Sequence, residues 1–318
     1  MTEASKPKLC VIGSINVDTT YRVQQIPVLG ETILASHKSV APGGKGANQA
    51  VAAASMGSRV SMVGCTGSDP DGEYALHSLV ARDVDVSQVR ALGKAPTGTA
   101  VLIVDEHGEN VIVVDPGANQ CLDPHQVAAH LSLVQYDVVL AQLEVNLDAV
   151  VAAASSCGAA TFVLNPAPMK ASHAALNELL KHTDVLVPNR LELARLAGRE
   201  PPTDQAALDR CVAELGFGGV VSVTLGSAGV AVYERGPGRR PTLIEAVPVP
   251  TVDTSGAGDV FCGVFCHWMA KDGNVVGAAR RANEMAALST TFRGAQLPPS
   301  LATSPGRRPS SAAPPSRT

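Results

Sequence analysis

Residues 251–259 read Thr-Val-Asp-Thr-Ser-Gly-Ala-Gly-Asp, and the helical stretch Val260–Ala270 follows them directly. Glycines just before a helix leave backbone N–H groups free to point at one spot. Together with the positive end of the helix they form an anion hole. Asp259, at the helix start, can accept a proton from an alcohol. This stretch therefore suits phosphoryl transfer to a hydroxyl, although a capped helix after a glycine-rich turn has the same local pattern.

A second glycine-rich turn, Pro42–Ala50, reads Pro-Gly-Gly-Lys-Gly-Ala-Asn-Gln-Ala. It resembles a phosphate loop, but the Walker A spacing of glycine, lysine and serine or threonine is absent. Its glycines let the backbone approach a ligand closely. Asn48, near the next helix start, can both donate and accept hydrogen bonds with sugar hydroxyls. The alternative is a turn with a purely structural role.

A third turn, Gly13–Asp18, comes directly after the first predicted strand. Ligands of open α/β sheets bind outside the carboxyl ends of the strands. Asn16 and Asp18 alternate in position, so both can face the same side and bind the hydroxyls of a polyol. An Asx turn is the alternative interpretation.

Short apolar runs alternate with alanine-rich helical stretches along most of the chain. We expect strands at 9–12, 60–63, 138–142, 161–164, 185–187 and 220–224, and helices at 47–56 and 72–82. This alternation indicates βαβ units around a mostly parallel sheet. The strands are continuously apolar, which suits a sheet covered by helices on both faces. The predicted fold class is therefore α/β with three layers.

Three regions depart from this alternation. Segments of about 19–39 and 97–116 are rich in β-forming residues and are expected to form a small β lid, with ordinary edge strands as the alternative. From Leu297 the chain is rich in Pro, Ser, Arg and Ala and lacks apolar periodicity. Such a segment cannot bury enough surface to offset its ordering entropy. We therefore expect one α/β domain over 1–296 and a disordered tail over 297–318.

The composition argues against several classes of protein. The 318 residues carry a net charge of −4, with a sequence pI near 6.1, and contain no polybasic stretch, which argues against nucleic acid and anionic membranes as partners. No signal peptide and no apolar run of 18 residues is found. Seven scattered cysteines fit a cytoplasmic protein. Cys262 and Cys266, four apart on a helix, are interpreted as small buried hydrophobes rather than half of a metal site.

Taken together, the three turns resemble the ribokinase-like (PfkB) sugar-kinase family, and its ribokinase branch in particular, from residue 9 to about 296. The resemblance implies a central sheet flanked by helices, with a β lid that also forms a homodimer interface. It implies transfer of the ATP γ-phosphate to the 5-hydroxyl of D-ribose, with Mg²⁺ as cofactor. Alternatives are a fructokinase-like or nucleoside kinase of the same family, or a sugar-binding protein that has lost turnover.

The resemblance also implies roles for individual residues. It makes Asp259 the catalytic base, and the anion hole would consist of Gly256, Ala257 and Gly258. The implied sugar-binding residues are Asn16, Asp18, Gly44, Lys45, Asn48, Glu144 and Asp259. The implied nucleotide-binding residues are Asn189, Thr224, Gly226, Gly229, Gly258 and Asn283. Glu192, in the run Asn189–Glu192, would organise Mg²⁺ indirectly.

Members of this branch are also activated by a monovalent cation, usually K⁺. The implied ligands here are Asp253, Ser255, Ser289, Phe292 and Gly294. The chain departs from the family pattern after them, because Leu297-Pro298-Pro299 replaces the usual Ser/Pro-containing loop and closing helix. Pro298 falls where a serine completes the cation site. We therefore expect weak K⁺ activation, or none.

Overall fold

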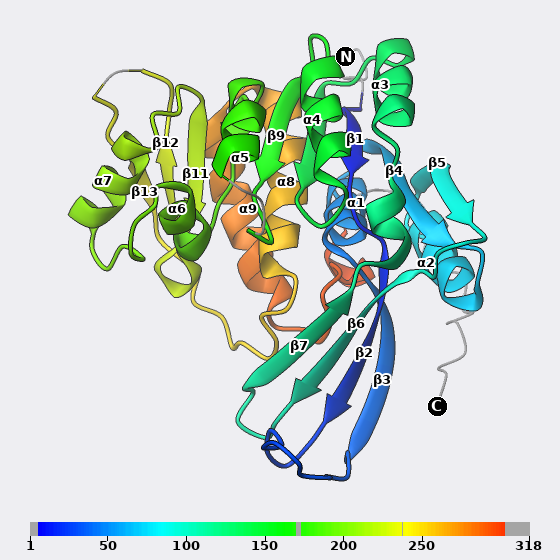
Figure 1. Cartoon of the computed structure of the whole chain (residues 1–318). Coiled ribbons are helices and arrows are strands. Elements are labelled where there is room, and N and C mark those ends of the chain that lie inside the picture. The colour runs from blue at the N-terminus through cyan, green and yellow to red at the C-terminus, as the bar shows by residue number, and fades with distance from the viewer. Residues whose placement is uncertain (1–5, 170–172, 237, 303–318) are drawn as a thin grey trace.

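Two β-sheets organise the structure, a computed structural model that describes residues 6–169, 173–236 and 238–302. A nine-stranded sheet lies between two layers of helices, and a four-stranded sheet projects from the carboxyl ends of its strands (Figure 1). The pairs from β11 to β5 are parallel, whereas β12 and β13 add to the far edge in antiparallel fashion. The predicted α/β class is confirmed.

The large sheet has its first strand near the middle. Its order is β13 (Thr242–Ile244), β12 (Val230–Tyr233), β11 (Val220–Thr224), β10 (Val185–Leu186), β9 (Thr161–Asn165), β8 (Val138–Gln142), β1 (Lys8–Ile12), β4 (Arg59–Gly67) and β5 (Val84–Leu92). Strand β1 lies between β4 and β8, so the strand order runs in opposite directions on its two sides. Open α/β sheets bind ligands at such a switch point. The edge strands β5, β12 and β13 were not predicted.

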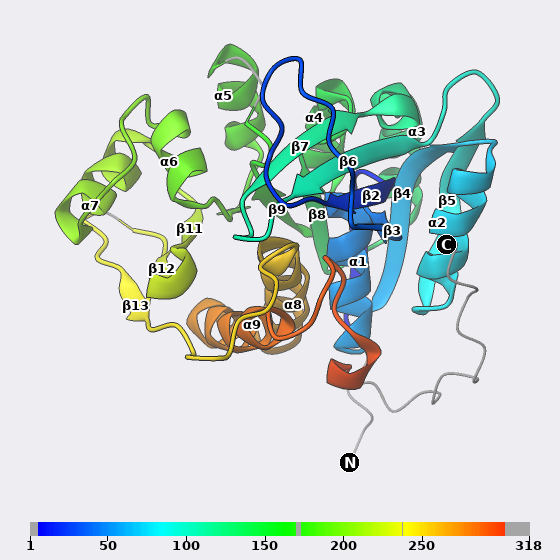
Figure 2. The ribbon, with the colours of Figure 1, turned by 90° about the horizontal axis from the view of Figure 1, so that it is seen from below.

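Both faces of the large sheet are buried, because successive side chains of a strand point to opposite faces. On β1, Leu9 and Val11 pack into one apolar cluster, and Cys10 and Ile12 into the other. The first cluster lies under α1 (Lys45–Ser55), α2 (Pro70–Val80), α8 (Ala257–Asp272) and α9 (Val275–Ser289). The second lies under α3 (Pro124–Leu133), α4 (Leu147–Ser156), α5 (His173–Lys181), α6 (Arg190–Leu196) and α7 (Gln205–Glu214). Figure 2 shows α1, α8 and α9 on one side and α3, α4 and α5 on the other.

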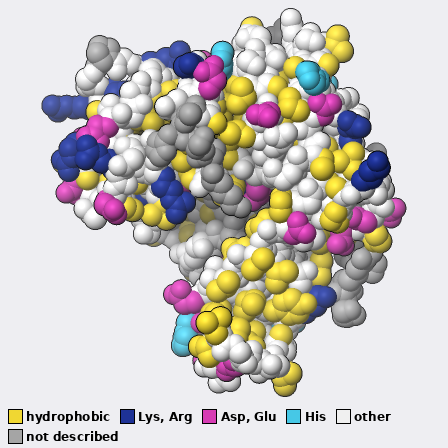
Figure 3. Space-filling view, viewed as in Figure 1, with side chains coloured by type: hydrophobic (Ala, Val, Ile, Leu, Met, Phe, Trp, Pro, Cys, Tyr) yellow, Lys and Arg dark blue, Asp and Glu magenta, His cyan; other side chains and the backbone are white. Residues whose placement is uncertain are grey.

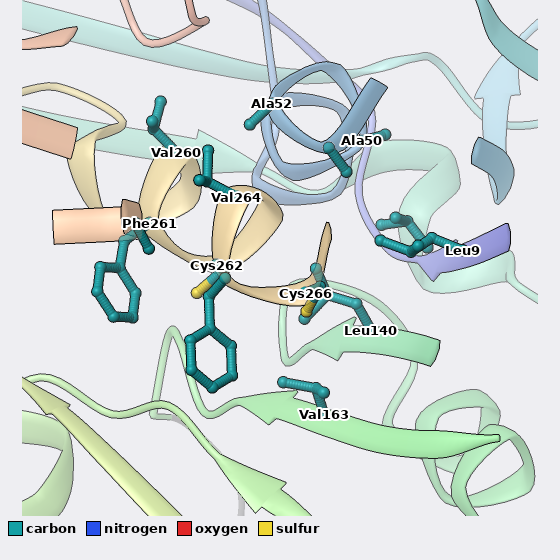
Figure 4. Packing of buried hydrophobic residues seen from close by; sticks show 14 of the residues in the cluster. Leu9, Ala50, Ala52, Leu140, Val163, Val260, Phe261, Cys262, Val264 and Cys266 are labelled. Carbon is teal, nitrogen blue, oxygen red and sulfur yellow. The ribbon is translucent and has the colours of Figure 1, made fainter. Parts of the chain in front are cut away.

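Helices α1 and α8 pack tightly against each other, and this contact sets the position of the site. Val260 and Val264 of α8 lie beside Ala50 and Ala52 of α1 (Figure 4). At Gly263 an added Cβ would lie 2.4 Å from the carbonyl oxygen of Gln49. Small residues at this crossing therefore bring the first turns of the two helices together.

The four-stranded sheet has the order β3 (His37–Gly43), β2 (Asn16–Arg22), β6 (Gly98–Val104) and β7 (Asn110–Asp115). It extends from the carboxyl end of β1, as Figure 1 shows. β2 begins at Asn16, so Asn16 and Asp18 lie in a strand and share a face of this sheet, and the Asx-turn alternative is wrong. The segment 23–36 between β2 and β3 contains no strand.

The expectation that the chain loses its apolar contacts at Leu297 is wrong for residues 297–302. Leu297 is fully buried in the first cluster, and Leu301, at the end of a short 3₁₀ turn (Pro299–Leu301), packs against the same cluster. The guanidinium of Arg82 donates a hydrogen bond to the carbonyl of Leu297. A single leucine can fill a core position without any periodic pattern. Residues 303–318 lie outside the described part of the chain.

Over the described residues, no helix combines the length and the hydropathy that crossing a bilayer requires.

Candidate active site

The carboxylate of Asp259 lies at the junction of α1 and α8. Asp259 is the third residue of α8 and is 6% exposed. Its Oδ2 accepts a hydrogen bond from Asn48 Nδ2 at 3.1 Å, and its Oδ1 accepts one from Gln49 Nε2 at 3.0 Å. Burial raises the pKa of this carboxyl, whereas the charge of Lys45 and the two amides oppose the rise. The carboxylate is thus held in one orientation beside a cation.

Gln49 connects Asp259 to the strand ends of the large sheet. Its Nε2 also lies 3.2 Å from Asn165 Oδ1, and its Oε1 accepts a hydrogen bond from Gln142 Nε2 at 2.6 Å. Asn165 Nδ2 donates in turn to the carbonyl of Val187 at 2.9 Å. Gln49 and Gln142 are fully buried. This network holds the carboxylate in place on its protein side, and no sequence motif indicated it.

The first turn of α8 is open to an anion. Gly256 precedes the helix with φ +69°, and a Cβ there would lie 2.1 Å from the carbonyl oxygen of Ala295. Among the described residues, no side chain caps this helix. Within the described ranges, the backbone N–H groups of Gly258 and Asp259 have no protein acceptor. These free donors at a positive helix end suit an anion. Of the three residues predicted to form the anion hole, Ala257 already donates its N–H to the carbonyl of Thr254 at 3.2 Å.

Two cavities meet at this helix end. A cavity of about 220 Å³ contains Lys45, Asn189, Glu192 and Asp259 in its wall. A larger cavity of about 600 Å³ is lined by five of the predicted nucleotide-binding residues, Thr224, Gly226, Gly229, Gly258 and Asn283. Both cavities are also lined by Thr224, Thr254, Ala257 and Gly258. A long ligand could therefore lie in the larger cavity and reach Asp259 past the start of α8.

The first turn of α1 is already occupied by a carboxylate of the protein. Gly44 precedes α1 with φ +88°. Glu144 Oε2 accepts hydrogen bonds from the backbone N–H of Lys45 at 3.1 Å and from the hydroxyl of Ser14. The Ser14 hydroxyl also accepts from the N–H of Gly46 at 3.3 Å. This helix end is therefore neutralised within the protein and is not a phosphate loop.

Asp18 lies beside this acidic end. Burial raises the pKa of its carboxyl to about 7, and the charges of Glu144 and Asp259 add to the rise while Lys45 opposes it. In the described structure its Oδ1 is buried without a hydrogen-bond partner, as is Oδ1 of Asn48. Two unpaired acceptors in one buried site suit a ligand that is rich in hydroxyl groups. The predicted sugar-binding residues thus lie together at the base of the small sheet.

Lys45 is the cation of the site. Asp259 raises the pKa of its ammonium most, burial opposes this, and Glu144 and Glu192 add to the rise. An amine surrounded by three carboxylates stays charged at neutral pH. It can therefore compensate negative charge in the small cavity.

The run Asn189–Glu192 forms a capping box at the start of α6. Asn189 Oδ1 accepts from the N–H of Glu192 at 2.8 Å, and Glu192 Oε2 accepts from the N–H of Asn189 at 2.8 Å. Burial raises the pKa of Glu192. Among the described residues, no group of three His, Cys, Asp or Glu side chains could hold a metal ion. Cys262 and Cys266 are both buried, as expected.

The predicted cation ligands come from two segments. Asp253 and Ser255 precede α8, whereas Ser289 ends α9 and Phe292 and Gly294 follow it. The carboxylate of Asp253 accepts hydrogen bonds from the N–H of Ser255 at 2.9 Å and of Gly294 at 3.0 Å. Burial alone would raise the pKa of Asp253, but these N–H groups outweigh it and hold the pKa below its usual value. The carbonyl of Ser289 accepts from the N–H of Phe292 at 3.1 Å. Backbone hydrogen bonds therefore hold the two segments together in the described structure.

Comparisons with known proteins agree with this geometry. Residues 6–302 match the pfkB family carbohydrate kinase. A ribokinase of Haemophilus influenzae is 35% identical over 293 residues, which cover 91% of this chain and 94% of that protein. A deoxyribokinase of Salmonella typhi is 34% identical over 297 residues, covering 91% and 94%.

The solved structure of an Arabidopsis thaliana ribokinase, complexed with ribose and ATP, has the same fold. It matches with a TM-score of 0.80 at 29% identity, covering 93% of this chain and 96% of that one. The sequence match and the structural match both extend over nearly the whole chain. The chain therefore belongs to the pfkB family of carbohydrate kinases.

Proposed function

We propose that this enzyme is a ribokinase that transfers the γ-phosphate of ATP to the 5-hydroxyl of D-ribose. The observation that carries this proposal is the position of Asp259, a buried carboxylate at the open end of α8 where the two cavities meet. The Arabidopsis relative with ribose and ATP supports the choice of both substrates.

In this proposal the sugar binds at the acidic end of α1. Asn16, Asp18, Asn48 and Glu144 bind its hydroxyls, and Gly43 and Gly44 let it approach the backbone. The unpaired Oδ1 atoms of Asp18 and Asn48 are acceptors that hydroxyls would satisfy. The 5-hydroxyl then points toward Asp259.

ATP lies in the larger cavity, with its base near Asn283 and its phosphates near the start of α8. Asp259 accepts the proton of the 5-hydroxyl as the sugar oxygen bonds to the γ-phosphorus. The bond between the γ-phosphorus and its bridging oxygen breaks, and ADP leaves with that oxygen. The N–H groups of Gly256 and Gly258, with the ammonium of Lys45, stabilise the charge on the transferring group. Ala257 can contribute only if its N–H leaves the carbonyl of Thr254.

The donor set suits Mg²⁺ that is held mainly by phosphate and water. Mg²⁺ commonly binds through one or two carboxylates together with substrate phosphates. Glu192 is the carboxylate in the wall of the small cavity that could serve it, directly or through water. When bound, the ion would neutralise the phosphate oxygens.

The proposed site for K⁺ lies between the segment before α8 and the end of α9, and consists of Asp253, Ser255, Ser289, Phe292 and Gly294. Both carboxylate oxygens of Asp253 already accept backbone N–H groups. Each oxygen keeps a further lone pair for an ion, but Pro298 stands where a serine would complete the site, so we expect K⁺ to activate weakly or not at all. A titration of turnover with K⁺ against Na⁺ tests this.

The four-stranded sheet is the proposed lid, and its outer face the proposed dimer interface. Val101 of β6 pairs with Val113 of β7, and these valines are 38% and 64% exposed. Figure 3 shows apolar side chains gathered over this sheet. An apolar sheet face of this kind invites a second copy, while the opposite face, with Asn16 and Asp18, would close over the sugar. We further propose a cytoplasmic location, since all seven cysteines are free thiols.

A coupled assay of ADP release tests the activity against D-ribose, 2-deoxyribose, fructose and nucleosides, with ATP and Mg²⁺. The proposal predicts the highest kcat/KM for D-ribose. A higher value for 2-deoxyribose would indicate a deoxyribokinase instead, which is the activity named for the similar Salmonella protein. Sugar binding without turnover would indicate a binding protein instead.

A further inference from the structure

Asn119 joins the lid to the sugar end of the site. It lies in a 3₁₀ turn (Gly117–Cys121), where the chain returns from β7, and is 1% exposed. Its Oδ1 accepts a hydrogen bond from the backbone N–H of Ile15 at 2.9 Å. Its Nδ2 donates to the carbonyl of Ile15 at 3.3 Å and to Oδ1 of Asn16 at 2.8 Å.

These hydrogen bonds determine the orientation of the Asn119 amide and, through it, that of the Asn16 amide. A backbone N–H can only donate, so the atom of Asn119 that faces Ile15 N–H must be the oxygen. The Nδ2 of Asn119 must then face Asn16, and the atom of Asn16 that faces it must be Oδ1. This leaves Nδ2 of Asn16 to face a ligand.

The space around this amide pair depends on Gly98, the first residue of β6. A Cβ at Gly98 would lie 2.2 Å from Nδ2 of Asn119 and 2.3 Å from Oδ1 of Asn16. Gly98 is also the register partner of Asn16 in the lid sheet. The contact between the two amides thus lies where the lid strands leave the main body.

We infer that Asn119 is a positioning residue for sugar specificity, which turns the Asn16 amide so that Nδ2 donates to one sugar hydroxyl oxygen. Asp18, on the same face of β2, accepts from a hydroxyl. The sugar therefore binds next to one fixed donor, Asn16 Nδ2, and one fixed acceptor, the carboxylate of Asp18. This inference rests on the proposed function, because it assumes that a sugar binds at Asn16.

The variant Asn119→Asp tests the inference. Its carboxylate still accepts from Ile15 N–H, but it presents an acceptor to Asn16 where the wild type presents a donor. The Asn16 amide should then rotate to donate to the new carboxylate and turn Oδ1 toward the sugar. We expect the Kd for D-ribose, measured by calorimetry, to rise about tenfold or more, and the KM for ATP to change less than about twofold.

The decisive comparison uses three analogues of D-ribose, each lacking one of the hydroxyls at C1, C2 and C3. One of them lacks the hydroxyl that Asn16 contacts, so its affinity should depend little on the orientation of the Asn16 amide. Asn119→Asp should therefore weaken one analogue by less than about twofold and weaken the other two as much as ribose. Equal weakening of all three, or of none, would overturn the inference.

Asn146→Asp is the matched control. Asn146 caps α4 and donates to the carbonyl of Leu122 at 3.4 Å, so the same chemical change is made at a nearby loop contact. Its sugar affinities should match the wild type. If Asn119→Asp does not fold, Asn119→Ala serves in the same comparison, because it also frees the Asn16 amide. If the wild type phosphorylates a different sugar, the proposed function is wrong, and the same test with that sugar's deoxy analogues still decides the role of Asn119.

Discussion

Helices α1 and α8 both begin after a glycine with positive φ, yet their first turns differ in chemistry. At α1 the carboxylate of Glu144 and the hydroxyl of Ser14 accept the first N–H groups. At α8 the N–H groups of Gly258 and Asp259 lack a protein acceptor within the described chain. A glycine-rich turn before a helix therefore does not by itself define a phosphate site, because a distant carboxylate can occupy it first.

The charges around the two helix ends reinforce this difference. Glu144 and Asp18 lie at the α1 end and would repel a phosphoryl group, whereas they suit the hydroxyls of a sugar. The start of α8 faces the cavity that contains the ammonium of Lys45. In our account, α1 therefore receives the sugar and α8 receives the phosphates, with Asp259 between them.

The largest expected effect comes from removing the base between the two ends. Asp259→Asn keeps the shape of the side chain but loses the proton acceptor, so kcat should fall about 10²- to 10⁴-fold. The Kd for D-ribose should change little, since the other hydroxyl contacts remain. Steady-state kinetics and calorimetry give both values, and near wild-type turnover would show that Asp259 is not the base.

The next effect separates the two helix ends directly. Gly256→Ala forces a Cβ against the carbonyl of Ala295, and Gly44→Ala forces one against the backbone of Ser14 and Asn16, both at positive φ. Each should lower the free energy of unfolding by about 1–3 kcal/mol. We expect Gly256→Ala to raise the KM for ATP about tenfold, and Gly44→Ala to do so for the sugar. Steady-state kinetics give the KM for ATP and for the sugar in both variants. Equal changes of both KM values in the two variants would contradict this difference between the helix ends.

A milder change alters only the charge at the α1 end. Glu144→Gln keeps an oxygen for the N–H of Lys45 but removes the carboxylate. The KM for D-ribose should rise about tenfold, the usual loss for a hydrogen bond to a charged group. The KM for ATP should stay within about twofold. A larger change for ATP than for ribose would place the phosphates at α1 and contradict this account.

The last effect is on stability and its pH dependence rather than on turnover. The pKa of Asp18 is about 7 in the folded protein and near 3.8 in an unfolded chain. Between these values the folded protein binds more protons, so the free energy of unfolding should fall as the pH rises from about 4 to about 7. Asp18→Asn should reduce this fall and stabilise the ligand-free protein at pH 8 by about 2 kcal/mol. Thermal melts from pH 4 to 8 measure it, and a variant less stable than wild type at pH 8 would contradict the pKa.

Much of the fold could be predicted from local pattern. Strands β8 and β11 have the predicted bounds, since each is an apolar run between turn residues. The edge strand β5 was missed because Val84–Leu92 mixes polar and apolar residues. Leu297 was assigned to the tail because its neighbours are polar or proline, although its own side chain is buried.

The site was predictable as far as its residues lie in short motifs. The motifs located Asp259, Asn48 and the turn before α8, whose roles remain proposals. They gave no sign of contacts between distant segments. Ser14 and Glu144 are 130 residues apart, and Asn119 and Asn16 are 103 apart. Only the folded chain brings such pairs together. The carboxylate of Glu144 at the start of α1 and the hydrogen bond from Asn119 to Asn16 therefore could not be inferred from spacing.

The most direct test of the account is where the transferring phosphoryl group sits. A crystal structure of the wild-type enzyme with D-ribose, ADP, Mg²⁺ and aluminium fluoride would locate a mimic of that group. We predict the mimic at the start of α8, bonded to the N–H of Gly258, with the ribose 5-oxygen between it and Asp259. A mimic bound at the start of α1, beside Glu144, would contradict the account.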